Sequence, residues 1–379
     1  MRHPRPSRLA DLAPNALIVW LWLCILLVFS LVLLGGAVRL SGAGLSMVEW
    51  RPLAGVLPPL DAAAWQRAFA KYQASPEFKL LHAGMNLVEF QFIFWMEYAH
   101  RLLGRVVALA FLLPFLFFLW RRMVPRGVAW RLWMLFALGA LQGLLGWHMV
   151  RSGLINVPQV SHYRLMMHLL LAALIYAYML RVVVGLSRIS RVNQIGRMSR
   201  ISRIARISRV ARNRRARADA AVRVTGALAM LMLMLMLASG ALVAGTRAGY
   251  ILNTWPKMGG QWLPTDALVM YPWWLNLFEN PATIQFVHRW LAALALLAAG
   301  GFALRLMRAG QARFGTAVLG LALAQVALGI ATLTLRVPPD LAIAHQAGAM
   351  ALLGAVVIAL SANLSPLVRA VHSTTSEST

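Results

Sequence analysis

The sequence predicts an all-α membrane protein with eight transmembrane helices, arranged as two pseudo-symmetric four-helix bundles with both termini in the cytoplasm. Three observations lead to this fold class. Hydrophobic residues make up 60% of the 379-residue chain, several apolar runs are long enough to cross a bilayer, and the second half of the chain repeats motifs of the first. Because such a composition lies outside the range of soluble domains, we expect the lipid bilayer to surround the protein.

The apolar runs follow one another along almost the whole chain. We predict spans at Ala16–Val38, Ala99–Trp120, Ala129–Val150, Leu165–Leu186, Val224–Gly245, Ile284–Arg305, Gly315–Leu335 and Leu341–Leu364. The first span has full length after a short basic segment, so we interpret it as an anchor and not as a cleaved signal.

The net charge of +26 would suit a nucleic-acid-binding protein. The basic residues are instead distributed by side of the membrane, because most of the 37 Lys and Arg residues fall in inner segments if the N-terminus is cytoplasmic. This pattern indicates that both termini are cytoplasmic and predicts no nucleic-acid partner. The single cysteine, Cys24, excludes an intramolecular disulfide and a metal site built from thiolates.

The repeat divides the chain into five expected segments. They are a cytoplasmic tail (1–15), an N-terminal four-helix bundle with a long outer loop (16–186), an Arg-rich cytoplasmic linker (187–222), a C-terminal four-helix bundle (223–364) and a cytoplasmic tail (365–379). In the linker, Arg recurs with a period of three at nine positions between Arg188 and Arg215, a stripe that drifts around an α-helix. We interpret the linker as a low-complexity, partly helical segment attracted to anionic headgroups, or as a solvated linker without a specific partner.

Four pairs of motifs carry the repeat, which indicates two units of the same orientation. Gly240–Gly249 resembles Gly36–Gly44, Trp255-Pro256 resembles the corner from Trp50 to Pro52, Gln285-Phe-Val-His-Arg resembles Glu97-Tyr-Ala-His-Arg, and Gln325–Gly329 resembles Gln142–Gly146.

Four histidines share one position, near the outer start of an even-numbered span: His100, His168, His288 and His345. Two imidazoles from facing helices of a bundle can hold a haem iron from above and below. The sequence therefore predicts two haem sites, one formed by His100 with His168 and the other by His288 with His345. Hydrogen-bonded structural histidines are the alternative, whereas zinc would need ligands that converge on one point.

Charged residues stand next to these histidines. Arg101 and Arg289 directly follow the first His of each pair, and Arg105 lies one turn later. A guanidinium group pairs well with a carboxylate, so we expect these residues to bind haem propionates; contact with lipid phosphates is the alternative. The aromatic run Phe90–Trp95 is typical of either a membrane-interface belt or the mouth of a ligand site.

One position differs between the two repeats. Glu97 stands three residues before His100, on the same helix face, whereas Gln285 stands three residues before His288. We interpret Glu97 as a catalytic carboxylate that moves protons beside the N-terminal haem. The alternative is a carboxylate that stabilises a helix N-terminus.

The run Glu89–Arg105 and the four histidines resemble haem A synthase over nearly the whole chain, from about Ala16 to Leu364. The resemblance implies a multi-pass enzyme of the bacterial inner membrane, with its haem sites near the periplasmic side. It implies that the methyl group at ring position 8 of haem O becomes the formyl group of haem A, through two hydroxylations and loss of water. It also implies that His100 and His168 receive haem O, that His288 and His345 bind a haem b cofactor, and that Glu97 is catalytic.

Some members of this family carry a cysteine pair in the first outer loop, and this chain has none there. The resemblance implies haem O synthase and oxidase assembly factors as partners, and it leaves the electron donor and a homo-oligomer open. Two other functions fit the residues alone: a bis-His di-haem electron carrier of cytochrome b type, and a haem chaperone or transporter that releases haem unchanged.

Overall fold

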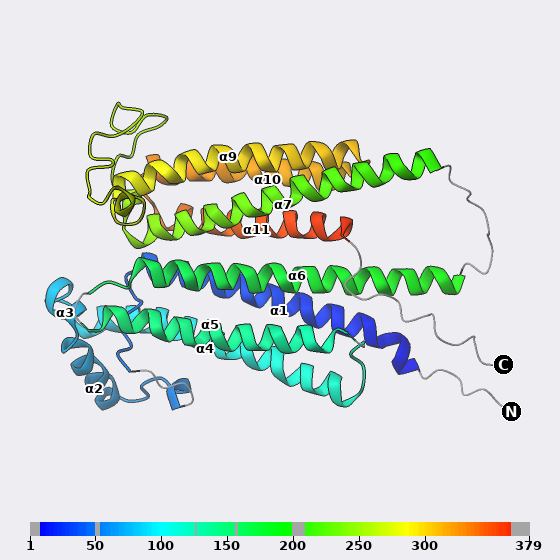
Figure 1. Ribbon diagram of the computed structural model, residues 1–379. Helices are drawn as coiled ribbons and strands as arrows, with labels where there is room; N and C mark the ends of the chain where they lie inside the picture. Colours follow the sequence, from blue (N-terminus) through cyan, green and yellow to red (C-terminus); the bar gives the residue numbers. More distant parts are fainter. Residues whose placement is uncertain (1–7, 50–53, 126, 156–157, 199–208, 365–379) are drawn as a thin grey trace.

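The computed structural model describes residues 8–49, 54–125, 127–155, 158–198 and 209–364 (Figure 1). Within these residues the regular structure is helical, apart from one isolated β-bridge. Eight helices are long and apolar enough to cross a membrane, which confirms the predicted multi-pass all-α fold. They are α1 (Arg8–Leu40), α4 (Leu87–Trp120), α5 (Ala129–Gly153), α6 (His162–Met198), α7 (Arg209–Gly245), α9 (Pro281–Arg308), α10 (Ala312–Thr334) and α11 (Pro339–Asn363).

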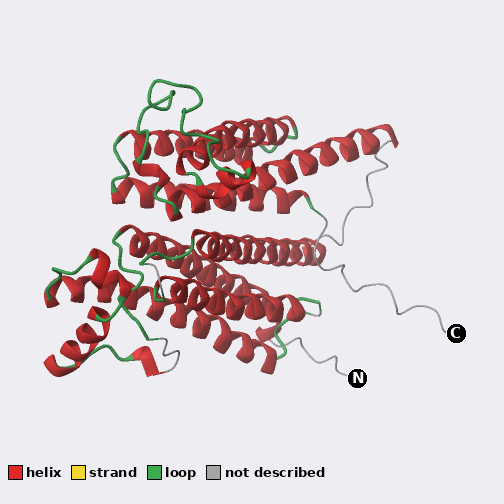
Figure 2. Ribbon diagram, turned by 60° about the vertical axis from the view of Figure 1, so that its left-hand side comes forward, coloured by secondary structure: helices red, strands yellow, loops and turns green. Residues whose placement is uncertain are grey.

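The spans form two rings of neighbouring helices (Figures 1 and 2). In the N-terminal ring, α1 packs on α4, α4 on α5, α5 on α6, and α6 again on α1. In the C-terminal ring, α7, α9, α10 and α11 follow one another in the same way. This arrangement leaves α4 diagonal to α6 and α9 diagonal to α11. The symmetry axis, the segment boundaries and the cytoplasmic position of the termini stay predictions.

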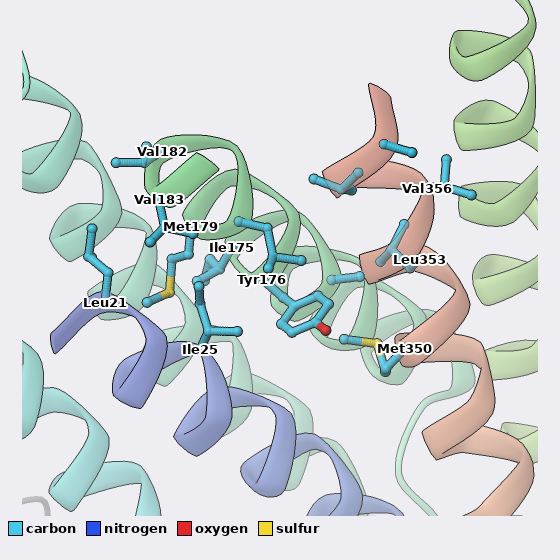
Figure 3. Packing of buried hydrophobic residues seen from close by; sticks show 14 of the residues in the cluster. Leu21, Ile25, Ile175, Tyr176, Met179, Val182, Val183, Met350, Leu353 and Val356 are labelled. Carbon is cyan, nitrogen blue, oxygen red and sulfur yellow. The ribbon is translucent and has the colours of Figure 1, made fainter. Parts of the chain in front are cut away.

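Helix α6 lies at the centre of the molecule, where the two rings meet. It packs on α1 and α5 of its own ring and on α7 and α11 of the other ring. The most apolar 18-residue stretch of α6 is 56% buried, a larger share than in any other span, which agrees with this central position. Figure 3 shows Tyr176 of α6 directed toward Met350 of α11, in an apolar cluster that also includes residues of α1. The two rings thus share one apolar core.

The loop between α1 and α4, which is predicted to lie on the outer side and is called the first outer loop below, folds into helices of its own. They are α2 (Ala62–Gln73) and α3 (Pro76–Leu81), after a short 3-10 turn at Ala54–Val56. Each helix begins where a side chain caps its free backbone N–H groups, since Asp61 accepts a hydrogen bond from Ala64 and Ser75 accepts one from Phe78. Tyr72 of α2 is fully buried against Phe90. The loop therefore packs as a small cap on the outward extension of α4.

The second span begins earlier than the sequence predicts, at Leu87 and not at Ala99. Asn86 and Glu89 form a capping box that starts the helix there. The predicted start followed the hydropathy of the sequence and overlooked this capping signal. The aromatic run is thus helical, and its two faces differ. Phe90 and Phe94 are buried under the cap, whereas Phe92 and Trp95 are exposed. The choice between a membrane-interface belt and the mouth of a ligand site stays a prediction.

The second outer loop, between α7 and α9, contains 3-10 turns at Ala248–Tyr250 and Trp273–Leu275 and the short helix α8 (Asn276–Glu279). On the opposite side, α6 continues to Met198 and α7 starts at Arg209, so the described parts of the Arg-rich linker are helical. The central part of the linker (199–208), the tails (1–7 and 365–379) and the predicted corner from Trp50 to Pro52 lie outside the described residues.

Candidate functional site

The two members of each predicted histidine pair come from diagonal helices. His100 lies on α4 and His168 on α6, while His288 lies on α9 and His345 on α11. The imidazoles of His100 and His168 are close enough to interact electrostatically, and so are those of His288 and His345. The structure therefore brings the predicted partners toward each other across the middle of each ring. Whether they bind haem iron stays a prediction.

Each of the four imidazole rings lies against a glycine on a neighbouring helix. A methyl group added to Gly35 would lie 3.0 Å from Cε1 of His100, and one added to Gly146 would lie 3.0 Å from Cε1 of His168. The corresponding distances in the C-terminal ring are 3.3 Å from Gly240 to His288 and 2.9 Å from Gly329 to His345. A larger residue at these positions would push the ring aside, so the glycines set the planes of the imidazoles.

Contact with the histidine also defines which positions of the two rings correspond. The sequence matched Gly240 with Gly36, but the residue against His100 is Gly35, so the register is shifted by one. Gly36 has a different neighbour, because a methyl group there would collide with the amide of Gln346. The sequence motifs contained the relevant glycines, yet only the packing shows which of two adjacent glycines meets the imidazole.

A glutamine supports the second histidine of each pair. Nε2 of Gln142 donates a hydrogen bond to the backbone carbonyl of His168 at 3.0 Å, and Nε2 of Gln325 donates one to the carbonyl of His345 at 2.9 Å. These residues lie one turn before Gly146 and Gly329 on α5 and α10. The repeat of Gln and Gly at this spacing was visible in the sequence, but its purpose was not.

Glu97 is 3% exposed and anchors the first outer loop. Its Oε2 accepts hydrogen bonds from the Ser46 hydroxyl at 2.6 Å and from the backbone N–H of Met47 at 2.9 Å. Its Oε1 pairs with the guanidinium of Arg101. The carboxylate lies in the third turn of α4, beyond the first turn in which a helix N-terminus stabilises negative charge, so the helix-terminus alternative does not account for it.

Gln285 is equally buried and holds the second outer loop in the same way. Its Nε2 donates to the carbonyls of Ala248 and Ile251, at 2.8 and 2.7 Å, while its Oε1 accepts a hydrogen bond from Arg289 at 3.0 Å. The N-terminal loop thus presents hydrogen-bond donors to an acceptor, whereas the C-terminal loop presents acceptors to a donor. Only the N-terminal ring has a carboxylate at this place.

The three arginines contact protein groups at the outer end of the helices. Arg101 donates to the carbonyls of Met47 and Glu49, Arg289 to those of Leu252 and Thr254, and Arg105 to the carbonyl of Arg101. Sequence reasoning missed this loop-holding role. Nε of Arg289 is buried and lacks a partner among the described residues, so it retains a donor for another group. The propionate role of Arg101, Arg105 and Arg289 stays a prediction.

Haem fits the donor set of these rings. Nδ1 of His100 and Nδ1 of His168 are buried and have no hydrogen-bond partner among the described residues. In the same part of the chain, no three His, Cys, Asp or Glu side chains gather in a way that could hold a metal ion. A metal held here would thus have two imidazole ligands from the protein and further ligands from elsewhere, which is the coordination that a porphyrin completes.

Comparison with known proteins places these features in one family. Residues 18–357 match the family model described as cytochrome oxidase assembly protein. The chain is 42% identical over 341 residues to haem A synthase of Nitrosospira multiformis, with 88% of this chain and 89% of the relative covered. It is 46% identical over 343 residues to haem A synthase of Rhodopseudomonas palustris strain TIE-1 (88% and 85%) and 45% identical over 339 residues to that of Bradyrhizobium diazoefficiens (88% and 88%).

Proposed function

The chain belongs to the family of cytochrome oxidase assembly proteins, and from this premise we propose how its two rings carry out the haem A synthase reaction named for its relatives. The protein is an oxidoreductase of haem O. It converts the methyl group at ring position 8 into a formyl group through two successive hydroxylations and the loss of one water molecule. The product is haem A for terminal oxidases.

The N-terminal ring receives the substrate haem O between His100 and His168. Glu97 is the catalytic carboxylate of this ring, because it is buried and lies one helical turn from His100. The hydrogen bond from Ser46 connects it to the first outer loop. Glu97 takes up and returns protons while the methyl group is oxidised, and Arg101 holds its carboxylate in place.

The C-terminal ring holds a haem b between His288 and His345. A haem bound there supplies electron transfer. The uncharged Gln285 fits this role, since it holds the loop and offers no carboxylate for proton transfer. Arg289 donates its remaining Nε–H group to a propionate of this haem. Arg101 and Arg105 bind the propionates of the substrate in the N-terminal ring.

The protein lies in the bacterial inner membrane with the outer loops, and therefore both haem sites, near the periplasmic side. The linker then faces the cytoplasm, together with both termini. Haem O synthase supplies the substrate, oxidase assembly factors receive the product, and a homo-oligomer is compatible with the exposed faces of the spans. The bis-His electron carrier is not favoured, because the named relatives are synthases.

The observation that carries this proposal is the buried carboxylate of Glu97 beside only one of two matched histidine pairs. The test is expression of the chain in a host that makes haem O but no haem A, followed by chromatography of the extracted haems. Haem A in the extract supports a synthase. Haem O and haem b alone, with the protein present in the membrane, would support a carrier or a chaperone.

A further inference from the structure

The first histidine of the C-terminal ring has a hydrogen-bond partner that the N-terminal ring lacks. Oγ of Ser239 lies 2.8 Å from Nδ1 of His288, and the same hydroxyl donates a hydrogen bond to the carbonyl of Met236 at 3.1 Å. Ser239 is 6% exposed and directly precedes Gly240, against which the His288 ring lies.

Together these two contacts favour one tautomer of His288, the one with its hydrogen on Nδ1. A hydroxyl group has one proton, and the carbonyl of Met236 can only accept it. While the hydroxyl donates to that carbonyl, Oγ of Ser239 can only accept a hydrogen bond from the Nδ1–H group of His288. With its hydrogen on Nδ1, the imidazole keeps the lone pair on Nε2 free, which is the arrangement that a metal ligand needs.

His100 has no such support. Its Nδ1 is buried and without a hydrogen-bond partner among the described residues. The glycine beneath its ring is Gly35, and the residue before that glycine is Leu34, which has no polar side-chain atom. Leu34 thus occupies, in the N-terminal ring, the place that Ser239 occupies in the C-terminal ring. Binding of iron through Nε2 of His100 would leave a buried Nδ1–H group unpaired.

We propose that Ser239 is a positioning residue that makes the C-terminal ring retain its haem, whereas Leu34 at the matching place makes the N-terminal ring release its haem readily. This inference rests on the proposed function, in which one ring keeps a cofactor and the other must exchange substrate for product. Partners that orient a metal-bound histidine typically change metal affinity by about 10- to 100-fold. One serine-to-leucine difference at matched positions thus separates a resident site from an exchanging site.

The test measures loss of haem from the purified full-length protein, loaded with haem b in both rings, to an excess of apomyoglobin. We expect two phases, a fast one from the N-terminal ring and a slow one from the C-terminal ring. Ser239→Ala should accelerate only the slow phase, by about 10- to 100-fold, and Ser239→Thr, which keeps the hydroxyl, should restore it. Leu34→Ser should slow only the fast phase.

A second measurement separates positioning from a general effect on folding. Ser239→Ala should shift the reduction potential of the slowly released haem and leave that of the other haem unchanged. A single phase for the parent protein, or unchanged rates in both Ser239→Ala and Leu34→Ser, would overturn the inference. If Ser239→Ala fails to fold, Leu34→Ser alone decides the question.

The outcome for this inference is distinguishable from the outcome for the proposed function. Haem release is measured without turnover, so altered phases with no haem A in any host would contradict the synthase and leave the role of Ser239 intact. Haem A formation with unaltered phases would contradict only the role of Ser239.

Discussion

Nε2 of Gln346 donates a hydrogen bond to the backbone carbonyl of Val32 at 2.8 Å and so joins α11 of one ring to α1 of the other. Gln346 directly follows His345, and its amide lies against Gly36, the neighbour of the glycine that meets His100. This junction between the two rings thus lies next to a predicted haem ligand in each of them, His345 in the C-terminal ring and His100 in the N-terminal ring.

Gly36→Ala should weaken this junction, because the added methyl group would collide with the Gln346 amide. Overpacking of this kind typically costs about 1 to 3 kcal/mol. Gly104→Ala is the matched control, since a methyl group there meets nothing within 4 Å and alanine favours a helix. Thermal unfolding in detergent should show a lower Tm for Gly36→Ala only. Equal Tm values for the two variants would contradict the close approach.

The glycines under the imidazoles provide a second prediction. Gly329→Ala should tilt the His345 ring and reduce haem bound to the C-terminal ring, and Gly146→Ala should do the same for the N-terminal ring. Gly320→Ala and Gly143→Ala, on the same helices, have free space and serve as controls. The haem-to-protein ratio, from the absorbance of the purified protein, should fall in the first two variants only. Full haem content in Gly329→Ala would show that the glycine does not set the ring.

Much of this arrangement could be predicted from sequence, because hydropathy and the repeated His motifs are local signals. Hydropathy alone predicts the eight spans, and the repeated motifs alone show which helices of the two halves correspond. The start of α4 at Leu87 was missed because hydropathy registers neither the capping box of Asn86 and Glu89 nor the packing of the helix extension against α2. Ser239 was missed for a related reason, since its meaning depends on an imidazole from a helix that lies beside it only after folding.

The two arginines should differ in what their loss costs. Arg101→Gln leaves the buried carboxylate of Glu97 without its charge partner, and breaking a buried ion pair typically costs about 3 to 5 kcal/mol. Arg289→Gln removes hydrogen bonds to carbonyls and to the neutral Gln285, at about 1 kcal/mol for each bond in a typical case. The drop in Tm should thus be larger for Arg101→Gln. A larger drop for Arg289→Gln would contradict an ion pair at Glu97.

The first outer loop should become less stable as the pH rises. Burial raises the pKa of Glu77 from its ordinary value of 4.5 to about 7, although the hydrogen bond from Tyr72 opposes the shift. The folded loop therefore binds a proton more tightly than the unfolded loop. Its contribution to stability is fully present below about pH 4.5 and is lost as the pH rises through about 7.

Hydrogen exchange of the amides of α2 and α3 at pH 5.5 and pH 8 measures this effect, after correction for the intrinsic exchange rate. Burial lowers the pKa of nearby His82, which gives a pH dependence of the opposite sign, so the comparison must use Glu77→Gln. In that variant the additional opening at pH 8 should disappear. Persistence of the same pH dependence in Glu77→Gln would assign it to another group.

The central claim is that Glu97 makes the N-terminal ring the place where haem O is oxidised. The most direct measurement is chromatography of haems extracted from a haem O-producing host that expresses the parent chain, Glu97→Gln or Gln285→Ala at matched protein levels. We predict haem A from the parent and from Gln285→Ala, and haem O without haem A from Glu97→Gln, which should still carry haem b. Haem A at the parent level in Glu97→Gln would contradict the claim.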